Sequence, residues 1–178
     1  MENVVYAVGK SGKVLVGRVL PGQDLIQGIE DAFRLSGFAS GNLVSCVGSL
    51  KKASFIYVKA KPGGLMGAGY DAPTILEGPI ELLSLQGPLV LDRGEVFCHF
   101  HGVVANQDGA ALGGHFYKEG TPAPDGQRLP GGNIVLATID FTIMGHEGAK
   151  IVRKLDPQLG MKTMTPQSDE ETTYENRA

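Results

Sequence analysis

Short apolar runs rich in β-branched residues recur along most of the chain, and glycine or proline separates them. Such runs are typical of strands, whereas the residues between them indicate turns. Because most successive runs follow one another closely, with only one predicted helix among them, we expect a mainly antiparallel sheet. The predicted strands span residues 4–8, 13–20, 43–48, 53–60, 80–85, 95–105, 110–117, 133–144 and 150–155.

Turn-forming residues set several of the predicted strand ends. A turn over residues 9–12 is expected to join the first two strands as a hairpin. Residues 49–52 separate the next two predicted strands, and Gly87-Pro88 ends the strand over 80–85.

One segment, residues 25–36, has helical periodicity instead. Its apolar residues recur at the spacing of one helix face, which needs a sheet to cover. Asp24 is a suitable N-cap with Gln27 as its capping-box partner, and Gly37 fits the position after the last helical residue. The pattern therefore predicts an α+β fold with one principal helix, as a single domain over residues 1–157. Residues 158–178 lose the apolar periodicity and are expected to form a flexible acidic tail.

Composition and charge narrow the class of protein. The chain has 178 residues, of which 42% are hydrophobic and 20% are charged, so it can bury a core of its own. Two cysteines, Cys46 and Cys98, are too few for a disulfide framework. The start does not resemble a signal peptide and no apolar run is long enough to span a membrane, so we expect a cytoplasmic protein without membrane contact. Acidic side chains outnumber basic ones by 19 to 16, which disfavours nonspecific binding to nucleic acid.

Three of the four histidines fall close together in the sequence. His99 and His101 are two residues apart on a predicted strand, so they share one face, whereas Cys98 points to the opposite face. Residues 107–109 suit a three-residue hairpin loop with Gly109 in the left-handed conformation. Counting outward from that loop puts His101 opposite His115, with their β-carbons about 5 Å apart.

Three imidazoles and one open position are the ligand set of a catalytic zinc site. The sequence therefore predicts a divalent metal, Zn²⁺, bound by His99, His101 and His115, with water or a small ligand in the open position. A cupin would also need a Glu shortly after the second His, but Ala105 and Asn106 stand there. The fourth histidine, His146, lies in a predicted turn and is expected to be exposed and not a ligand. Glu81 either supports a site histidine or faces solvent.

Several segments together resemble a known family. They include Glu-Leu-Leu-Ser-Leu at 81–85, His-x-His at 99–101 and Gly-Gly-His at 113–115, and the others are residues 19–24, 41–50 and 153–157. Over residues 14–164 the chain resembles the plants-and-prokaryotes-conserved (PPC) domain family. The resemblance implies an α+β domain that assembles as a homotrimer, with a metal at the histidine cluster in some members.

The resemblance also carries a DNA-binding association, because plant members join this domain to AT-hooks. This chain has no Arg-Gly-Arg-Pro hook, and Pro79 stands where plant members have Arg, so it is similar to the stand-alone prokaryotic type. Three classes of function stay open: a metal-dependent enzyme or small-ligand binder, a DNA-binding protein, and an interaction module with a structural metal. The sequence assigns no catalytic residue.

Overall fold

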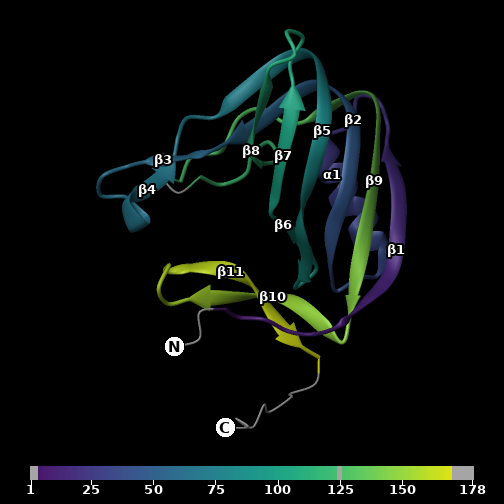
Figure 1. Cartoon of the computed structure of the whole chain (residues 1–178), viewed down its shortest axis with the longest axis vertical. Helices are drawn as coiled ribbons and strands as arrows, with labels where there is room; N and C mark the ends of the chain where they lie inside the picture. The colour runs from purple at the N-terminus through teal and green to yellow at the C-terminus, as the bar shows by residue number, and fades with distance from the viewer. Residues whose placement is uncertain (1–3, 124–125, 170–178) are drawn as a thin grey trace.

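The fold is a curved antiparallel sheet covered on one face by a single helix, in the computed structural model that describes residues 4–123 and 126–169 (Figure 1). The expected fold class is therefore confirmed. The elements in chain order are β1 (Lys10–Val19), α1 (Leu25–Ser36), β2 (Ser40–Ile56), β3 (Val58–Ala60), the 3₁₀ turn η1 (Leu65–Gly67), β4 (Ala68–Tyr70), β5 (Thr74–Asp92), β6 (Glu95–Cys98), β7 (Phe100–Ala105), β8 (Ala111–Phe116), β9 (Ile134–Glu147), β10 (Ala149–Asp156) and β11 (Met161–Ser168).

The main sheet is built around the long strands β2 and β5, which pair with each other. Beyond β2 lie β9 and then β1, and beyond β5 lie β6 and β7. Strand β8 pairs with β7 and also returns to the end of β2 at Phe55 and Ile56. This return curls the sheet, so that β7 and β8 are held against both long strands.

Helix α1 packs its apolar face on one side of the sheet, where Leu25, Ile29 and Phe33 are fully buried. Its first turn is capped as expected, because the Asp24 Oδ1 atom accepts from the Gln27 backbone N–H at 3.0 Å. The reciprocal capping-box bond is not formed, since the Gln27 side chain bonds Asp31 and Lys118 instead. Gly37 ends the helix at φ 75°, which confirms its predicted role.

Several predicted strand boundaries are wrong, for one common reason. The expected first hairpin does not form: β1 runs through residues 10–12 and pairs with β9, from the far end of the chain. Residues 49–52 are a bulged part of β2, in which Leu50 remains buried. Strand β5 likewise continues through Gly87-Pro88. In each case a long partner strand supplies hydrogen bonds that local turn signals do not reveal.

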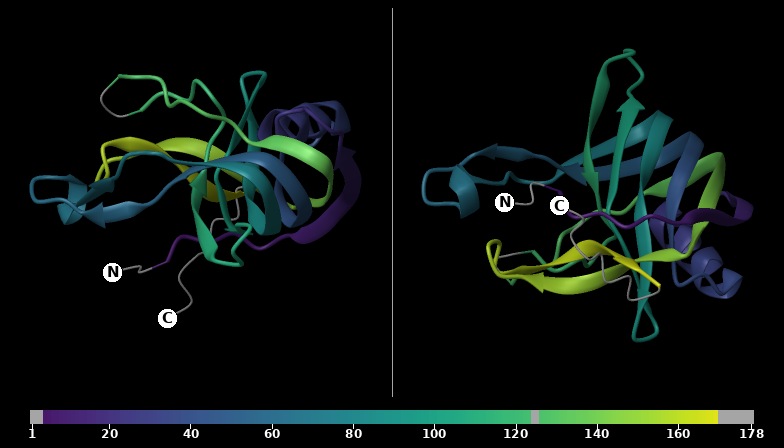
Figure 2. Two further views of the ribbon diagram at one scale, coloured as in Figure 1. Left: turned by 90° about the horizontal axis from the view of Figure 1, so that it is seen from above. Right: turned by 60° about the horizontal axis from the view of Figure 1, so that its bottom comes forward.

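Two hairpins, β3–β4 and β10–β11, project from the sheet on the side away from α1 (Figure 2). The expected tail over residues 158–178 thus includes a strand, because β11 pairs with β10 along its whole length. Arg153 of β10 lies over the Phe97 ring, 3.6 Å from its centroid, and so fastens this hairpin to the main sheet. Residues 170–178 of the expected tail lie outside the described residues.

In the described part of the chain, no helix is both long enough and apolar enough to cross a membrane.

Candidate metal centre

The hairpin between β7 and β8 has the register that the sequence predicts. The Gly109 N–H donates to the Asn106 carbonyl at 2.9 Å, and Gly109 has φ 77°. Asn106 and Ala110 close the loop through a backbone hydrogen bond, and the Asn106 side chain accepts from the backbone N–H groups of Asp108 and Ala110. The ladder that follows places His101 directly opposite His115. A left-handed glycine and an asparagine-stabilised loop therefore set the position of two site histidines.

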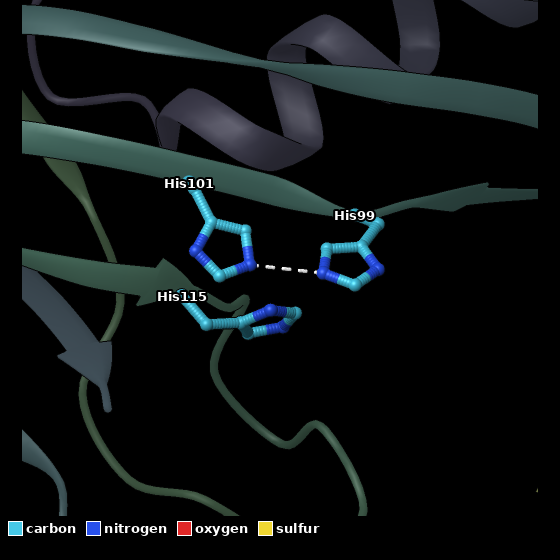
Figure 3. A group of neighbouring side chains, drawn as sticks. All are labelled: His99, His101 and His115. Atoms are coloured by element: carbon cyan, nitrogen blue, oxygen red, sulfur yellow. Dashed lines mark hydrogen bonds between the residues drawn. The ribbon is translucent and has the colours of Figure 1, made fainter. Parts of the chain in front are cut away.

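Strand parity places His99 beside them. His99 and His101 project from the same face, whereas Cys98 lies on the core side and contacts Glu30 of α1. The predicted orientation of Cys98 is thus confirmed. Figure 3 shows all three imidazoles on one side of the strands, with α1 on the other side.

His99 occupies an interruption between β6 and β7. Its backbone N–H donates to the Pro88 carbonyl at 3.0 Å, but Pro88 has no N–H to donate in return. The neighbouring Gly87 has φ 146°, and a β-carbon there would lie 2.0 Å from the His99 carbonyl oxygen. The Gly87-Pro88 pair lies within β5 without ending it, and the interruption falls instead between β6 and β7, at His99.

The three rings converge on one point. The Nε2 atoms of His99 and His101 lie 2.9 Å apart, and the ring centroids of the three pairs are separated by 4.9–5.2 Å. One ligand nitrogen from each ring lies within 4.8 Å of the others, and in the described residues no other His, Cys, Asp or Glu group of this kind occurs. Nitrogens bound to tetrahedral zinc are about 3.3 Å apart when the Zn–N bonds are 2.0–2.1 Å. The donor set and its spacing fit such an ion with small ring rotations.

Burial and neighbouring imidazoles favour the neutral form of His115 and His99. Burial, and to a smaller extent the nearby His99 and His101 rings, together lower the pKa of His115 to about 4. The pKa of His99 is also lowered, mainly by burial and then by His101. The Nδ1 atom of His115 is buried without a hydrogen-bond partner in the described residues, which is costly for a polar nitrogen. Neutral imidazoles with spare lone pairs are what a divalent cation binds.

Residues from other elements border the cluster. The Tyr70 ring of β4 lies 6.0 Å from the His115 ring, so the β3–β4 hairpin forms one wall. On the other side an open groove of about 430 Å³ begins at His101 and runs along β7 and β8. Ser84 and Gln86 are its polar side chains apart from His101, and Gln86 is the cross-strand neighbour of His101. A ligand that reached the cluster along this groove would meet amide, hydroxyl and aliphatic groups but no charged side chain.

Two further candidates lie away from the cluster. Glu81 is exposed and sits opposite Ala105, so of the two interpretations the structure supports the solvent-facing one. The expectation that His146 is exposed is wrong, because the side chain is half-buried. His146 lies apart from the three-histidine cluster. His146 belongs to β9, and its two ring nitrogens bond Ser40 and Asn42 at 3.0 Å. The strand was predicted to end at residue 144, where its apolar run ends, but β9 continues to Glu147 and the turn therefore begins only there.

Comparison with known proteins identifies the family. The family model of the Plants and Prokaryotes Conserved (PCC) domain, the PPC domain named above, matches residues 6–145. The chain belongs to this family.

Solved structures share the fold at low sequence identity. A hypothetical protein from Salmonella matches with a TM-score of 0.72 and 22% identity, over 93% of this chain and 99% of its own. The metal-containing protein AF0104 from Archaeoglobus fulgidus has a TM-score of 0.68 and 23% identity, over 92% and 99%. A PPC protein from Pyrococcus horikoshii has a TM-score of 0.67 and 24% identity, over 90% and 97%. These likenesses establish the fold.

Two other matches have names that state neither a metal nor a PPC domain. A candidate DNA-binding protein from Bacteroides thetaiotaomicron has a TM-score of 0.63 and 17% identity, over 90% of this chain and 97% of its own. The bifunctional protein GlmU of Synechococcus sp. strain JA-3-3Ab is 29% identical over 143 residues, which is 80% of this chain. The match spans only 19% of that relative's length.

The lowered pKa of His115 predicts a pH dependence of the metal-free protein. Between the ordinary pKa of histidine, about 6.5, and the folded value of about 4, the unfolded chain binds more protons than the folded chain. The free energy of unfolding should therefore fall as the pH is lowered through this window. We expect urea denaturation in the presence of a chelator to show this loss between pH 7 and pH 5.

The variant His115→Gln provides the control, because it removes one titrating ring. Its loss of stability between the same two pH values should be smaller than that of the unaltered protein. An equal loss in both proteins would show that His115 titrates normally.

Proposed function

We propose that the protein is a metal-binding PPC-domain protein in which His99, His101 and His115 hold one divalent ion, zinc. The observation that supports this most directly is the convergence of three ring nitrogens within 4.8 Å of one another. The metal-containing character of the Archaeoglobus relative in fold is consistent with it. Zinc suits the site because imidazole nitrogen is one of its preferred ligands, whereas magnesium and calcium prefer oxygen.

We further propose that the metal keeps an open position for a small ligand. Three neutral imidazoles leave the full charge of the ion uncompensated, so the ligand would bring an anionic or carbonyl oxygen. The uncharged groove beside His101 suits the body of such a molecule, with Ser84 and Gln86 able to bond it. A bound zinc would polarise that oxygen or acidify a bound water, which is the chemistry an enzyme of this kind would need.

The variant His101→Ala tests the metal site. His101 contacts both other histidines, so its loss should reduce the metal content from about one ion per chain to almost none. Elemental analysis of the purified protein measures this directly. Cys98→Ala should retain about one ion per chain, since that side chain lies on the core side.

Either a full metal complement in His101→Ala or an empty Cys98→Ala protein would contradict the proposed ligand set. X-ray absorption on the zinc-loaded protein then separates two roles. Three nitrogen ligands with a bound water support a ligand-binding site, whereas a fourth protein ligand supports a structural metal.

We also propose that the chain assembles as a homotrimer. Helix α1 covers one face of the sheet, whereas large apolar side chains on the strands remain exposed: Val44, Val47, Leu83, Val103 and Leu136 are 41–52% exposed. If these side chains form one apolar patch, that patch is the kind of surface that subunits bury between them.

Light scattering at micromolar concentration tests the assembly. The expected molar mass is three times that of the chain, because burial of the apolar strand faces would stabilise the oligomer. A molar mass equal to that of one chain would contradict it.

DNA binding is the second candidate, favoured by the name of the Bacteroides relative in fold. The excess of acidic over basic side chains, 19 to 16, works against it because DNA affinity comes largely from phosphate contacts. In about 150 mM salt we expect dissociation constants weaker than about 10⁻⁶ M for any duplex. Tight, sequence-selective binding near 10⁻⁸ M in a salt titration would reverse the ranking of the two functions.

A further inference from the structure

A buried carboxylate on α1 contacts residues that are close in sequence to two of the site histidines. Glu30 of α1 is 6% exposed, and its Oε2 atom forms an ion pair with the Lys118 Nζ atom at 2.6 Å. Its other oxygen, Oε1, accepts a long contact of 3.7 Å from the Cys98 thiol. Lys118 also donates to Gln27 one turn earlier on the helix, at 3.0 Å.

The two partners of Glu30 come from the segments that carry site histidines. Cys98 is the residue immediately before His99, and Lys118 follows His115 by three residues. Both contacts are made to Glu30 of α1, and Figure 3 shows this helix on the side of the strands opposite the imidazole rings. One carboxylate therefore fastens both segments to the same helix.

His99 is the ligand that most needs such support. Its strand is interrupted, and its backbone has one ladder hydrogen bond to Pro88 where a regular residue would have two. The adjoining Cys98 side chain contacts Glu30 of α1 through its thiol. The orientation of the His99 ring then depends on what holds Cys98.

We propose that Glu30 is a positioning residue of the metal site, which orients His99 through Cys98 and His115 through Lys118. This inference rests on the proposed metal-binding function. It assigns the buried ion pair a role beyond stability, because a small displacement of a ligand atom weakens a metal bond. Glu30 itself lies on the far side of the strands and does not touch the ion.

The test measures zinc affinity of the full chain by competition with a chromophoric chelator. Partners outside the ligand shell typically change metal affinity 10–100-fold, and we expect Glu30→Ala to weaken binding about tenfold while the stoichiometry stays at one ion per chain. Glu30→Gln should weaken binding only about threefold, because its single amide oxygen can still accept from Lys118 whereas its NH2 group cannot accept from Cys98. The visible spectrum of the cobalt-substituted Glu30→Ala protein should also change, which a loss of stability alone would not cause.

Ser40→Ala is the matched control. Ser40 is buried, 2% exposed, and its hydroxyl bonds His146 and the Ile151 N–H, so its removal also costs stability without touching the segments around the cluster. Its zinc affinity should equal that of the unaltered protein. If Glu30→Ala does not fold, Cys98→Ala removes only the contact beside His99 and should weaken binding about threefold.

The outcomes distinguish the two levels of the proposal. Wild-type affinity in Glu30→Ala, or in Cys98→Ala where that variant replaces it, overturns the positioning role and leaves the metal site intact. Equal weakening in Ser40→Ala also overturns it, because the effect would then follow general stability. An unaltered protein that binds no zinc overturns the metal site and the positioning role together.

Discussion

The candidate centre depends on the antiparallel register of β7 and β8. Gly109 adopts a left-handed conformation that closes a short loop, and every pair in the ladder beyond it is thereby fixed. Because side chains alternate between faces, a slip of one residue would turn His115 toward the core and away from His101. The position of a glycine at the tip of the hairpin thus determines whether three imidazoles meet at its base.

The rest of the sheet keeps that hairpin in place and makes the cluster unfavourable to protonate. Strand β8 is anchored to the end of β2 at Phe55 and Ile56, and α1 covers the opposite face. His99 and His115 therefore lie beside neighbouring rings, and burial together with these neighbours lowers the pKa of each of the two. A cluster of closely spaced imidazoles has little stabilising role of its own, whereas a bound cation would satisfy its lone pairs.

The sequence predicted the local features well and the long-range ones poorly. The capped helix, the loop at residues 107–109 and the parity of His99 and His101 each depend on residues a few positions apart, and all are confirmed. The extents of β1, β2 and β5 depend on partners far along the chain, so turn signals at 9–12 and 49–52 misplaced their ends. Tyr70 comes to lie beside His115, and Glu30 beside Lys118, only through tertiary packing, and no local pattern marks either residue. Gly87-Pro88 was predicted to end its own strand, but the interruption that it causes lies in the neighbouring strand, at His99.

Anomalous diffraction at the zinc edge, from crystals of protein purified without a chelator, tests the central claim most directly. The account predicts a single anomalous peak between the rings of His99, His101 and His115, at zinc–nitrogen distances of about 2.0–2.1 Å. It also predicts a non-protein ligand at the remaining position. A peak elsewhere in the chain, or no peak between these rings after zinc is added, would contradict the claim that the β7–β8 register builds a metal centre.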